Sequence, residues 1–446
     1  MSIAEGVALV CSGASTMVLG GPGRGKSTMA HKVTEHLYKV KGTVVISAAS
    51  TGKAAEHIPQ GNVNGRRFPG MTVHSTLLQK DMWESVIQSK PRHIVVMVDE
   101  VFMLNADPFI KLLRKLKRVT YQIQQTFPGH RLAVQWVFTG DECQLQSVGD
   151  SLLTVVEFTN WLAEAKVVFC TLTEHQRFKA CAEYVELVDA LERRDARRVV
   201  EILSGLCVGP ARPSPPPGAP AIFLGYTNKE VQSYNMQAQR HYAGIPGALV
   251  YVFVHPKTNA VLWTAARGSN LVSKKNMKDA DGRLVLTNGS ICVMEAVVGT
   301  ACTLSQVTAG YDKRAHRFYF LDKELKVDVL KDEAIQTVCA RKESKEYLVD
   351  LKNGDGMTVH MSQGMTFKDK PVTCALGGVR DWQTMYVMLT RAEFISQLRI
   401  KPFAEDLIYR LAAAPLPPEV RAFQQRVRDS AELDADGAAR KRARVV

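Results

Sequence analysis

The chain has 446 residues, of which 46% are hydrophobic and 23% charged, a composition typical of a globular protein large enough for two to four domains. No apolar run reaches the roughly 18 residues that a membrane span requires, and no basic residue precedes Arg24, which argues against a signal or transit peptide. The formal net charge of +13 favours a polyanionic partner, although it also fits a basic protein without one. We therefore expect an intracellular protein that is not secreted and has no membrane partner.

Short apolar runs, each followed by a turn and then by helical periodicity, recur in the first part of the chain. They lie at residues 16–19, 44–46, 94–98, 134–138 and 167–169. Strands that are apolar on both faces are typical of a parallel sheet covered by helices. After Lys26, the apolar residues Met29, Val33 and Leu37 recur every fourth position, as on one stripe of a helix. This pattern predicts an α/β domain over residues 1–165.

The rest of the chain changes character several times. Residues 209–220 are rich in proline and are predicted to form an exposed connector. Buried strands are expected at 222–224 and 372–376, with helices at 229–240 and 385–391. The segment between them, 251–355, is rich in β-branched residues and glycine turns, which predicts a mostly β insertion. The basic tail, 413–446, is predicted to be disordered.

A phosphate-binding motif lies directly between the first predicted strand and helix. It reads Gly20-Gly21-Pro22-Gly23-Arg24-Gly25-Lys26-Ser27-Thr28 and fits the pattern G-x-x-x-x-G-K-S. Glycines let backbone N–H groups curl around phosphate oxygens at a helix N-terminus, while the lysine reaches the β- and γ-phosphates. The hydroxyl of Ser27 is a ligand for Mg²⁺ in this motif. The segment predicts that the chain binds ATP with Mg²⁺.

Acidic and amide side chains follow two later strands. Asp99 and Glu100 end the apolar run at 94–98, where the first carboxylate can hold Mg²⁺ through water and the second can orient the water that attacks the γ-phosphate. The segment Thr139-Gly140-Asp141-Glu142-Cys143-Gln144-Leu145 follows the run at 134–138. A polar residue at this place can sense the γ-phosphate. The residues therefore predict a nucleoside triphosphate hydrolase.

These motifs resemble, in order, those of the superfamily 1 helicases, and within them those of the Pif1/RecD-like (1B) group. Eight segments carry the resemblance: 20–27, 49–55, 72–75, 99–104, 140–145, 172–177, 358–366 and 386–392. They cover about residues 10–400. The chain departs from the family where Met361 replaces a usual lysine and Ser147 a common proline, and neither change removes a catalytic group.

The resemblance implies an α/β fold with two RecA-like parallel-sheet P-loop domains. The first, 1A, would cover residues 1–165, with a short pin-like 1B element at about 58–72. The second, 2A, would be built from 166–250 and 356–412. It would enclose the β-rich insertion at 251–355, which resembles the SH3-like 2B domain. The element at 58–72 fits a plain basic loop equally well.

The resemblance also assigns roles to residues. Arg177 and Arg391 would reach the γ-phosphate from the second domain, and Gln144 would couple the nucleotide to DNA. Together with Lys26, Asp99 and Glu100 they form the expected catalytic set. The residues expected to line the path of the nucleic acid are Thr51, Lys53, His74, His360, Ser362, Gln363 and Thr366.

We therefore predict an ATP-dependent DNA helicase, a monomeric motor that moves on single-stranded DNA and unwinds tailed duplexes. The resemblance to the 1B group implies that it moves 5′→3′. The resemblance implies a part in DNA replication, repair or recombination. An RNA helicase and a P-loop ATPase that does not translocate are the alternatives, although the second leaves Arg177 and the motifs around 358–366 and 386–392 unexplained. The basic run Arg440-Lys441-Arg442-Ala443-Arg444 fits a nuclear localisation signal, a DNA tether or a plain charge cluster, so a nuclear or a cytoplasmic site stays open.

Overall fold

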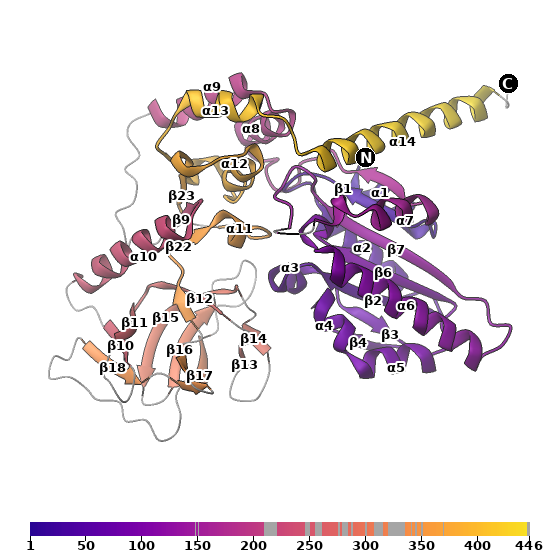
Figure 1. Cartoon of the computed structure of the whole chain (residues 1–446), viewed down its shortest axis with the longest axis horizontal. Coiled ribbons are helices and arrows are strands. Elements are labelled where there is room, and N and C mark those ends of the chain that lie inside the picture. The colour runs from indigo at the N-terminus through magenta and orange to yellow at the C-terminus, as the bar shows by residue number, and fades with distance from the viewer. Residues whose placement is uncertain are drawn as a thin grey trace. The chain divides into compact units, whose positions relative to one another are not determined.

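The computed structural model divides the chain into two compact units, Met1–Val185 with Ala413–Val446, and Glu186–Ala412 (Figure 1). It describes residues 1–147, 149, 151–208, 221–245, 250–254, 261–274, 277–278, 284–286, 289–298, 301–306, 315–319, 335–339, 341–343, 346–348, 351–368 and 370–443. The predicted proline-rich connector at 209–220 lies outside these residues. Among the described helices, none is both long and apolar enough to cross a bilayer.

The first unit is built on a mostly parallel sheet. Its parallel strands are β1 (Thr16–Leu19), β2 (Thr43–Ala49), β6 (His93–Asp99), β7 (Ala133–Gly140) and β8 (Val168–Thr171). They lie in the order β2-β6-β7-β1-β8, and each neighbouring pair runs parallel. The predicted α/β fold with a parallel sheet is thus confirmed in this unit.

Successive side chains of each strand point to opposite faces of the sheet, and both faces are buried. Val18, Val45 and Val95 pack with helices α1 (Ile3–Cys11) and α2 (Lys26–Leu37) on one face. Their neighbours in the strands join a larger core on the other face. That core includes residues of α4 (Val73–Leu78), α5 (Lys80–Gln88), η1 (Val101–Met103), α6 (Ala106–Thr126), η2 (Leu152–Thr154) and α7 (Val156–Glu164). Because helices cover both faces of the sheet, successive residues of its strands can all be apolar.

A β-hairpin extends the sheet beyond β2. It consists of β3 (Gly61–Val63) and β4 (Arg66–Phe68), which pair antiparallel and join β2 through the pair Val45 and Asn62. Asn64 and Gly65 form its turn with positive φ values of 50° and 84°, as two-residue hairpin turns require. The short strand β5 (Met71–Thr72) pairs parallel with β2, and α3 (Gly52–His57) lies between β2 and the hairpin in the chain. The predicted element at 58–72 is therefore a two-stranded hairpin followed by this short strand.

The C-terminal segment belongs to the first unit and is helical, so the prediction of a disordered tail over 413–446 was wrong for most of its length. Helix α14 spans Pro418–Ala443. Val420 and Phe423 are buried in the core of the unit, with Leu416 and Val427 partly buried beside them. These apolar residues recur every three or four positions and form one stripe of a helix, which the many charged residues between them conceal.

The second unit contains a smaller parallel sheet in the order β22-β9-β23-β24. Its strands are β9 (Ile222–Gly225), β22 (Gly356–Thr358), β23 (Val372–Ala375) and β24 (Leu398–Lys401). Its helices are α8 (Ala182–Arg193), which begins just before the division, α9 (Ala196–Val208), α10 (Asn228–Ala243), α11 (Val359–Ser362), η3 (Leu376–Gly378), α12 (Trp382–Leu389), η4 (Ile395–Gln397) and α13 (Glu405–Ala413). A parallel sheet in this part of the chain agrees with the second α/β domain that the sequence predicts.

Between α10 and β22, every described element is a strand, which agrees with a β-rich insertion. The strands are β10 (Val250–Val254), β11 (Val261–Ala266), β12 (Asn270–Ser273), β13 (Met277–Lys278), β14 (Leu284–Leu286), β15 (Ile291–Val298), β16 (Ala301–Gln306), β17 (Ala315–Tyr319), β18 (Ile335–Cys339), β19 (Arg341–Glu343), β20 (Glu346–Leu348) and β21 (Leu351–Asn353). The largest of their sheets has the order β17-β16-β15-β12-β21.

The division between the units differs from the predicted boundary at residue 165. Strand β8 pairs with β1 from Thr16 to Leu19, and the first unit continues to Val185. The physical reason is that β8 completes the parallel sheet of the first unit, a long-range pairing that no local pattern reveals.

Candidate active site

The phosphate-binding motif connects β1 to α2 through glycines that no other residue could replace without strain. Gly23 and Gly25 have positive φ values of 74° and 90°, a backbone region that side chains disfavour. A Cβ atom on Gly25 would lie 2.6 Å from Ile3 Cδ1, and one on Gly23 would lie 2.7 Å from Arg177 Cβ. The loop therefore needs glycine at both positions, for conformation and for space.

Lys26 is buried at the first position of α2. Its ammonium donates hydrogen bonds to the carbonyl oxygens of Gly20 (2.5 Å) and Gly21 (3.3 Å), which keeps the charge inside the loop. Ser27 and Thr28, the next two residues, are exposed. A buried ammonium and a hydroxyl at the N-terminus of a helix form a site suited to phosphate oxygens.

Asp99 ends strand β6 and is buried, with 8% of its surface exposed. Its carboxylate accepts hydrogen bonds from the Thr139 hydroxyl and from the backbone N–H of Glu100 (3.0 Å). Because β1, β6 and β7 are parallel, their carboxyl ends meet at one edge of the sheet, where ligands of such sheets bind. Asp99, Thr139 and the phosphate-binding loop therefore share that edge.

Glu100 has a left-handed backbone conformation with a φ of 51°. A residue other than glycine in this region costs about 1–3 kcal/mol and persists only where its surroundings impose it. The unusual backbone turns the chain from β6 into the short helix η1. The carboxylate expected to orient water thus stands at a strained turn.

Gln144 lies in a tight loop after β7. Its amide Nε2 donates to Asp141 Oδ2 (2.8 Å), and the backbone N–H of Cys143 donates to Asp141 Oδ1 (3.0 Å). The Oε1 atom of Gln144 is buried and accepts no hydrogen bond from the described residues. Buried polar atoms are normally satisfied, so this acceptor is available for a ligand or an ordered water.

Arg177 lies in the first unit, against the phosphate-binding loop, and not in the second domain as predicted from the sequence. The backbone N–H groups of Gln176 and Arg177 donate to the Gly23 carbonyl oxygen (2.7 and 3.0 Å). The Arg24 guanidinium donates to the Thr173 carbonyl oxygen, which ties the loop to the same segment. The segment is held there because β8, just before it, pairs with β1.

The three residues of the first unit that are expected to contact nucleic acid differ in burial and in their partners. Thr51 caps helix α3 by accepting from the N–H of Ala54 (3.1 Å). Lys53 is buried, and its ammonium lies 2.5 Å from Glu56 Oε2, so a nucleic-acid phosphate would have to share or replace that ion pair. His74 on α4 is exposed. Of the three, His74 is the side chain most open to a ligand.

In the second unit, His360 and Ser362 lie in α11, and Gln363 and Thr366 follow it in the chain. His360 is exposed, Thr366 is half-buried, and Ser362 and Gln363 are buried. The Ser362 hydroxyl donates to the Val359 carbonyl oxygen (2.8 Å), so it stabilises the helix.

Arg391 is almost fully buried in the second unit, directly after α12. Its guanidinium donates to the carbonyl oxygens of Val387 (2.9 Å) and Met365 (3.2 Å) and to the Thr390 hydroxyl (3.0 Å). It therefore joins two of the predicted motifs, 358–366 and 386–392.

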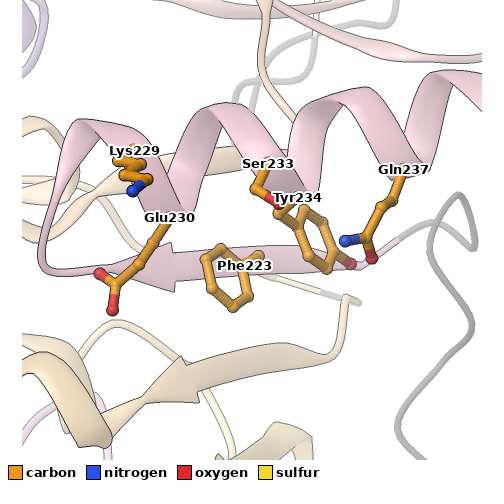
Figure 2. Close-up of a pocket in the computed structure, with 6 residues that line it drawn as sticks. All are labelled: Phe223, Lys229, Glu230, Ser233, Tyr234 and Gln237. Carbon is orange, nitrogen blue, oxygen red and sulfur yellow. The ribbon is translucent and has the colours of Figure 1, made fainter.

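The structure adds features that the sequence did not single out. Thr139 stands in a predicted motif that gave it no role, and the structure makes its hydroxyl the partner of Asp99. Figure 2 shows another, a cavity of about 430 Å³ along α10 and β9. It is lined by Phe223, Lys229, Glu230, Ser233, Tyr234 and Gln237. The rings of Phe223 and Tyr234 stack with their centroids 4.4 Å apart. Burial, and then the nearby Asp355 carboxylate, raise the pKa of Tyr234 to about 12.

Comparisons with known proteins agree with this geometry. Residues 4–150 match the family model of an AAA domain. No curated protein matches the sequence. Among solved structures, Pif1 helicase from Candida albicans is 17% identical with a TM-score of 0.60, over 95% of this chain and 98% of that one. Bacteroides Pif1 bound to single-stranded DNA is 17% identical with a TM-score of 0.61, over 96% and 97%.

The chain has the Pif1 helicase fold. A third structure, Pif1 helicase from Bacteroides in complex with ADP-AlF3 and single-stranded DNA, matches with a TM-score of 0.61 and 17% identity over 96% of this chain and 98% of that one. The Pif1 fold covers both units and confirms the fold class that the ordered motifs predict. At this level of identity the likeness is one of fold, and the roles of individual residues rest on the geometry above.

Proposed function

We propose that this chain is an ATP-dependent helicase that moves 5′→3′ on single-stranded DNA and unwinds tailed duplex DNA. One observation carries the proposal. The ammonium of Lys26, the buried carboxylate of Asp99 with its Thr139 partner, and the Arg177 segment bonded to Gly23 meet at one edge of a single sheet. Together with the Pif1 fold, this arrangement supports a nucleotide-driven motor.

The hydrolytic chemistry follows from charge. Lys26 would bind the β- and γ-phosphates, and Glu100 would orient the attacking water. A hydroxyl and a carboxylate are oxygen ligands of the kind that Mg²⁺ prefers, so Ser27 and Asp99 would hold this ion, which neutralises phosphate charge when bound. Arg177 and Arg391 would stabilise the charge that develops on the phosphoryl oxygens, for which a planar guanidinium is suited. Gln144, with its buried free acceptor, would report the state of the nucleotide to the DNA.

The nucleic acid would contact both units. Thr51, Lys53 and His74 belong to the first unit, and His360, Ser362, Gln363 and Thr366 to the second. The net charge of +13 favours a polyanion. One similar Pif1 structure is bound to single-stranded DNA, and another concerns DNA unwinding at forked duplex DNA. Intracellular location and action as a monomer belong to the same proposal.

The test combines ATP hydrolysis with strand displacement. We expect single-stranded DNA to raise kcat, and displacement on 5′-tailed but not 3′-tailed DNA duplexes. Displacement of 3′-tailed substrates alone would contradict the polarity, and a preference for RNA duplexes would favour the RNA helicase. ATP hydrolysis that no nucleic acid stimulates would contradict the motor as a whole.

A further inference from the structure

The C-terminal helix α14 lies on the first unit, although the whole second unit separates the two in sequence. Val420 and Phe423 are buried, and Val427 is partly buried one turn further along the same stripe. The Arg426 guanidinium donates to the carbonyl oxygen of Thr159 in α7 (2.7 Å). The helix also contacts β8 and η2 of the same unit, at the top of that unit in Figure 1. The helix is therefore part of the fold of the unit that holds the phosphate-binding loop.

The ring of Phe423 makes two edge-to-face contacts. Its centroid is 5.1 Å from that of Phe102 at an interplanar angle of 72°, and 5.7 Å from that of Phe169 at 76°. Edge-to-face aromatic pairs prefer this spacing and fix the rings relative to one another. Phe169 lies in β8, the strand that leads to Arg177. Phe102 lies in η1, the turn that follows Glu100.

Phe102 in turn contacts the other catalytic loop. A Cβ atom on Gly140 would lie 2.7 Å from Phe102 Cδ2, so the ring lies directly on the backbone at the end of β7. The Phe102 carbonyl oxygen accepts a hydrogen bond from the N–H of Ser147 (3.2 Å), on the far side of the Gln144 loop. One residue thus joins the turn after Glu100 to the loop that holds Gln144.

The turn after Glu100 depends on such support. The left-handed backbone of Glu100 is retained only if its neighbours hold it. The N–H of Met103 donates to the Glu100 carbonyl oxygen (3.0 Å), which closes η1 around Phe102. Without the ring of Phe423 against it, the ring of Phe102 would be free to shift, and the carboxylate of Glu100 would shift with it.

We propose that Phe423 is a positioning residue for hydrolysis. Through Phe102 it holds Glu100 and the Gln144 loop in place, and through Phe169 it supports β8, the strand that leads to Arg177. This inference rests on the proposed ATP hydrolysis. It gives the C-terminal helix a part in catalysis that acts through the residues of the catalytic loops.

The test compares three variants of the full-length chain. We expect Phe423→Ala to lower kcat by about tenfold or more, since a misplacement of about 1 Å at a catalytic group can cost about 100-fold, with KM for ATP nearly unchanged. Phe423→Leu keeps a large apolar side chain but loses the ring edge, and should lower kcat by about threefold. Val427→Ala is the matched control from the same stripe. It should keep kcat within about twofold of wild type at a temperature at which circular dichroism shows all three folded.

A double-mutant cycle tests the route through Phe102. In a Phe102→Leu background, Phe423→Ala should lower kcat by a smaller factor than it does in wild type, because the contact between these two rings is already broken and only the contact with Phe169 remains to be lost. If the factor by which kcat falls in the double variant is the product of the factors in the two single variants, the inference is wrong. It is also wrong if Phe423→Ala and Val427→Ala lower kcat equally. If Phe423→Ala does not fold, Phe423→Leu decides, and a kcat equal to that of wild type contradicts the proposal. If the wild-type chain has no ATPase activity, the proposed function is contradicted. If it is active and substitutions at Phe423 leave kcat unchanged, this inference alone is contradicted.

Discussion

At the scale of single residues, the contrast between Lys26 and Glu100 separates binding from hydrolysis. Lys26 is held inside the phosphate-binding loop by the carbonyl oxygens of Gly20 and Gly21, and its charge acts on phosphate. Glu100 stands outside that loop, at the strained turn after β6. Substitutions at the two positions should therefore affect different steps.

We expect Glu100→Gln to retain binding of ATP and to lower kcat by about 100-fold or more, because the amide keeps the shape of the side chain but cannot act as a base. Lys26→Ala should abolish hydrolysis and weaken nucleotide binding, with the fold intact, since the glycines set the shape of the loop. Binding of a fluorescent nucleotide and steady-state ATPase activity measure both effects. Loss of binding in Glu100→Gln would instead indicate a structural role for that carboxylate.

At the scale of elements, a buried carboxylate holds the β-rich insertion to the second sheet. Asp355 is buried just before β22. It accepts hydrogen bonds from the Tyr242 hydroxyl of α10 (3.2 Å) and from Asn270 Nδ2 of β12 (2.7 Å). Lys370 donates to Asn270 Oδ1 (2.6 Å). Burial raises the pKa of Asp355 above its usual value, although the hydrogen bonds from Asn270 and Tyr242 and the charge of Lys370 oppose the shift.

A pKa that is raised on folding means that the native state binds the proton more tightly than the unfolded chain does. The stabilisation from Asp355 should thus be complete below the ordinary carboxyl pKa of about 3.9 and should be lost as the pH rises through the raised value. We therefore expect the free energy of unfolding of wild type minus that of Asp355→Asn to fall as the pH rises from about 3.9 through the raised pKa of Asp355. Urea unfolding at several pH values measures it, with the exposed Asp406→Asn as a control that should leave the pH dependence unchanged. A difference that grows with pH would contradict the burial effect.

At the scale of the whole molecule, the proposed catalytic groups are divided between the units. Lys26, Glu100 and Arg177 belong to the first unit and Arg391 to the second. If hydrolysis needs Arg391, then a strand of DNA that binds both units should favour the active arrangement by differential binding. Its effect should be on kcat more than on the affinity for ATP.

We expect Arg391→Ala to lose most of the DNA-stimulated kcat, since an arginine finger contributes about 10³–10⁵ in rate, and to retain DNA binding. Arg391→Lys should restore little, because an ammonium lacks the planar fork that reaches several acceptors. Steady-state ATPase activity with and without a single-stranded oligonucleotide measures both, and DNA binding with circular dichroism controls for loss of the buried hydrogen bonds to Met365 and Val387. A kcat in Arg391→Ala within about threefold of wild type would contradict the proposed role of Arg391 in hydrolysis.

Local patterns account for most of what could be predicted. The apolar strands and the glycine-rich loop are readable because each depends on neighbouring residues, and the strands β1, β2, β6 and β7 lie where the pattern placed them. The position of Arg177 could not be predicted in the same way. It depends on the pairing of β8 with β1, whose residues are far apart in the chain.

The helix α14 and the state of Lys53 were missed for related reasons. The partners of Phe423 are Phe102 and Phe169, which are hundreds of residues earlier, and charged residues between the apolar ones gave the segment the composition of a tail. The burial of Lys53 against Glu56 depends on the packing of α3. A motif identifies such a side chain but does not predict its surroundings.

Because α14 completes the first unit, that unit is discontinuous in the chain, and this affects its synthesis. A ribosome adds about 5–20 residues per second, so the segment Glu186–Ala412 delays the emergence of α14 by roughly 10–45 s after the sheet of the first unit has been made. During that interval the rings of Phe102 and Phe169 lack their partner, and the nascent domain exposes an aromatic surface. We therefore expect the first unit to reach its native state last, after the second unit, although its sheet is translated first.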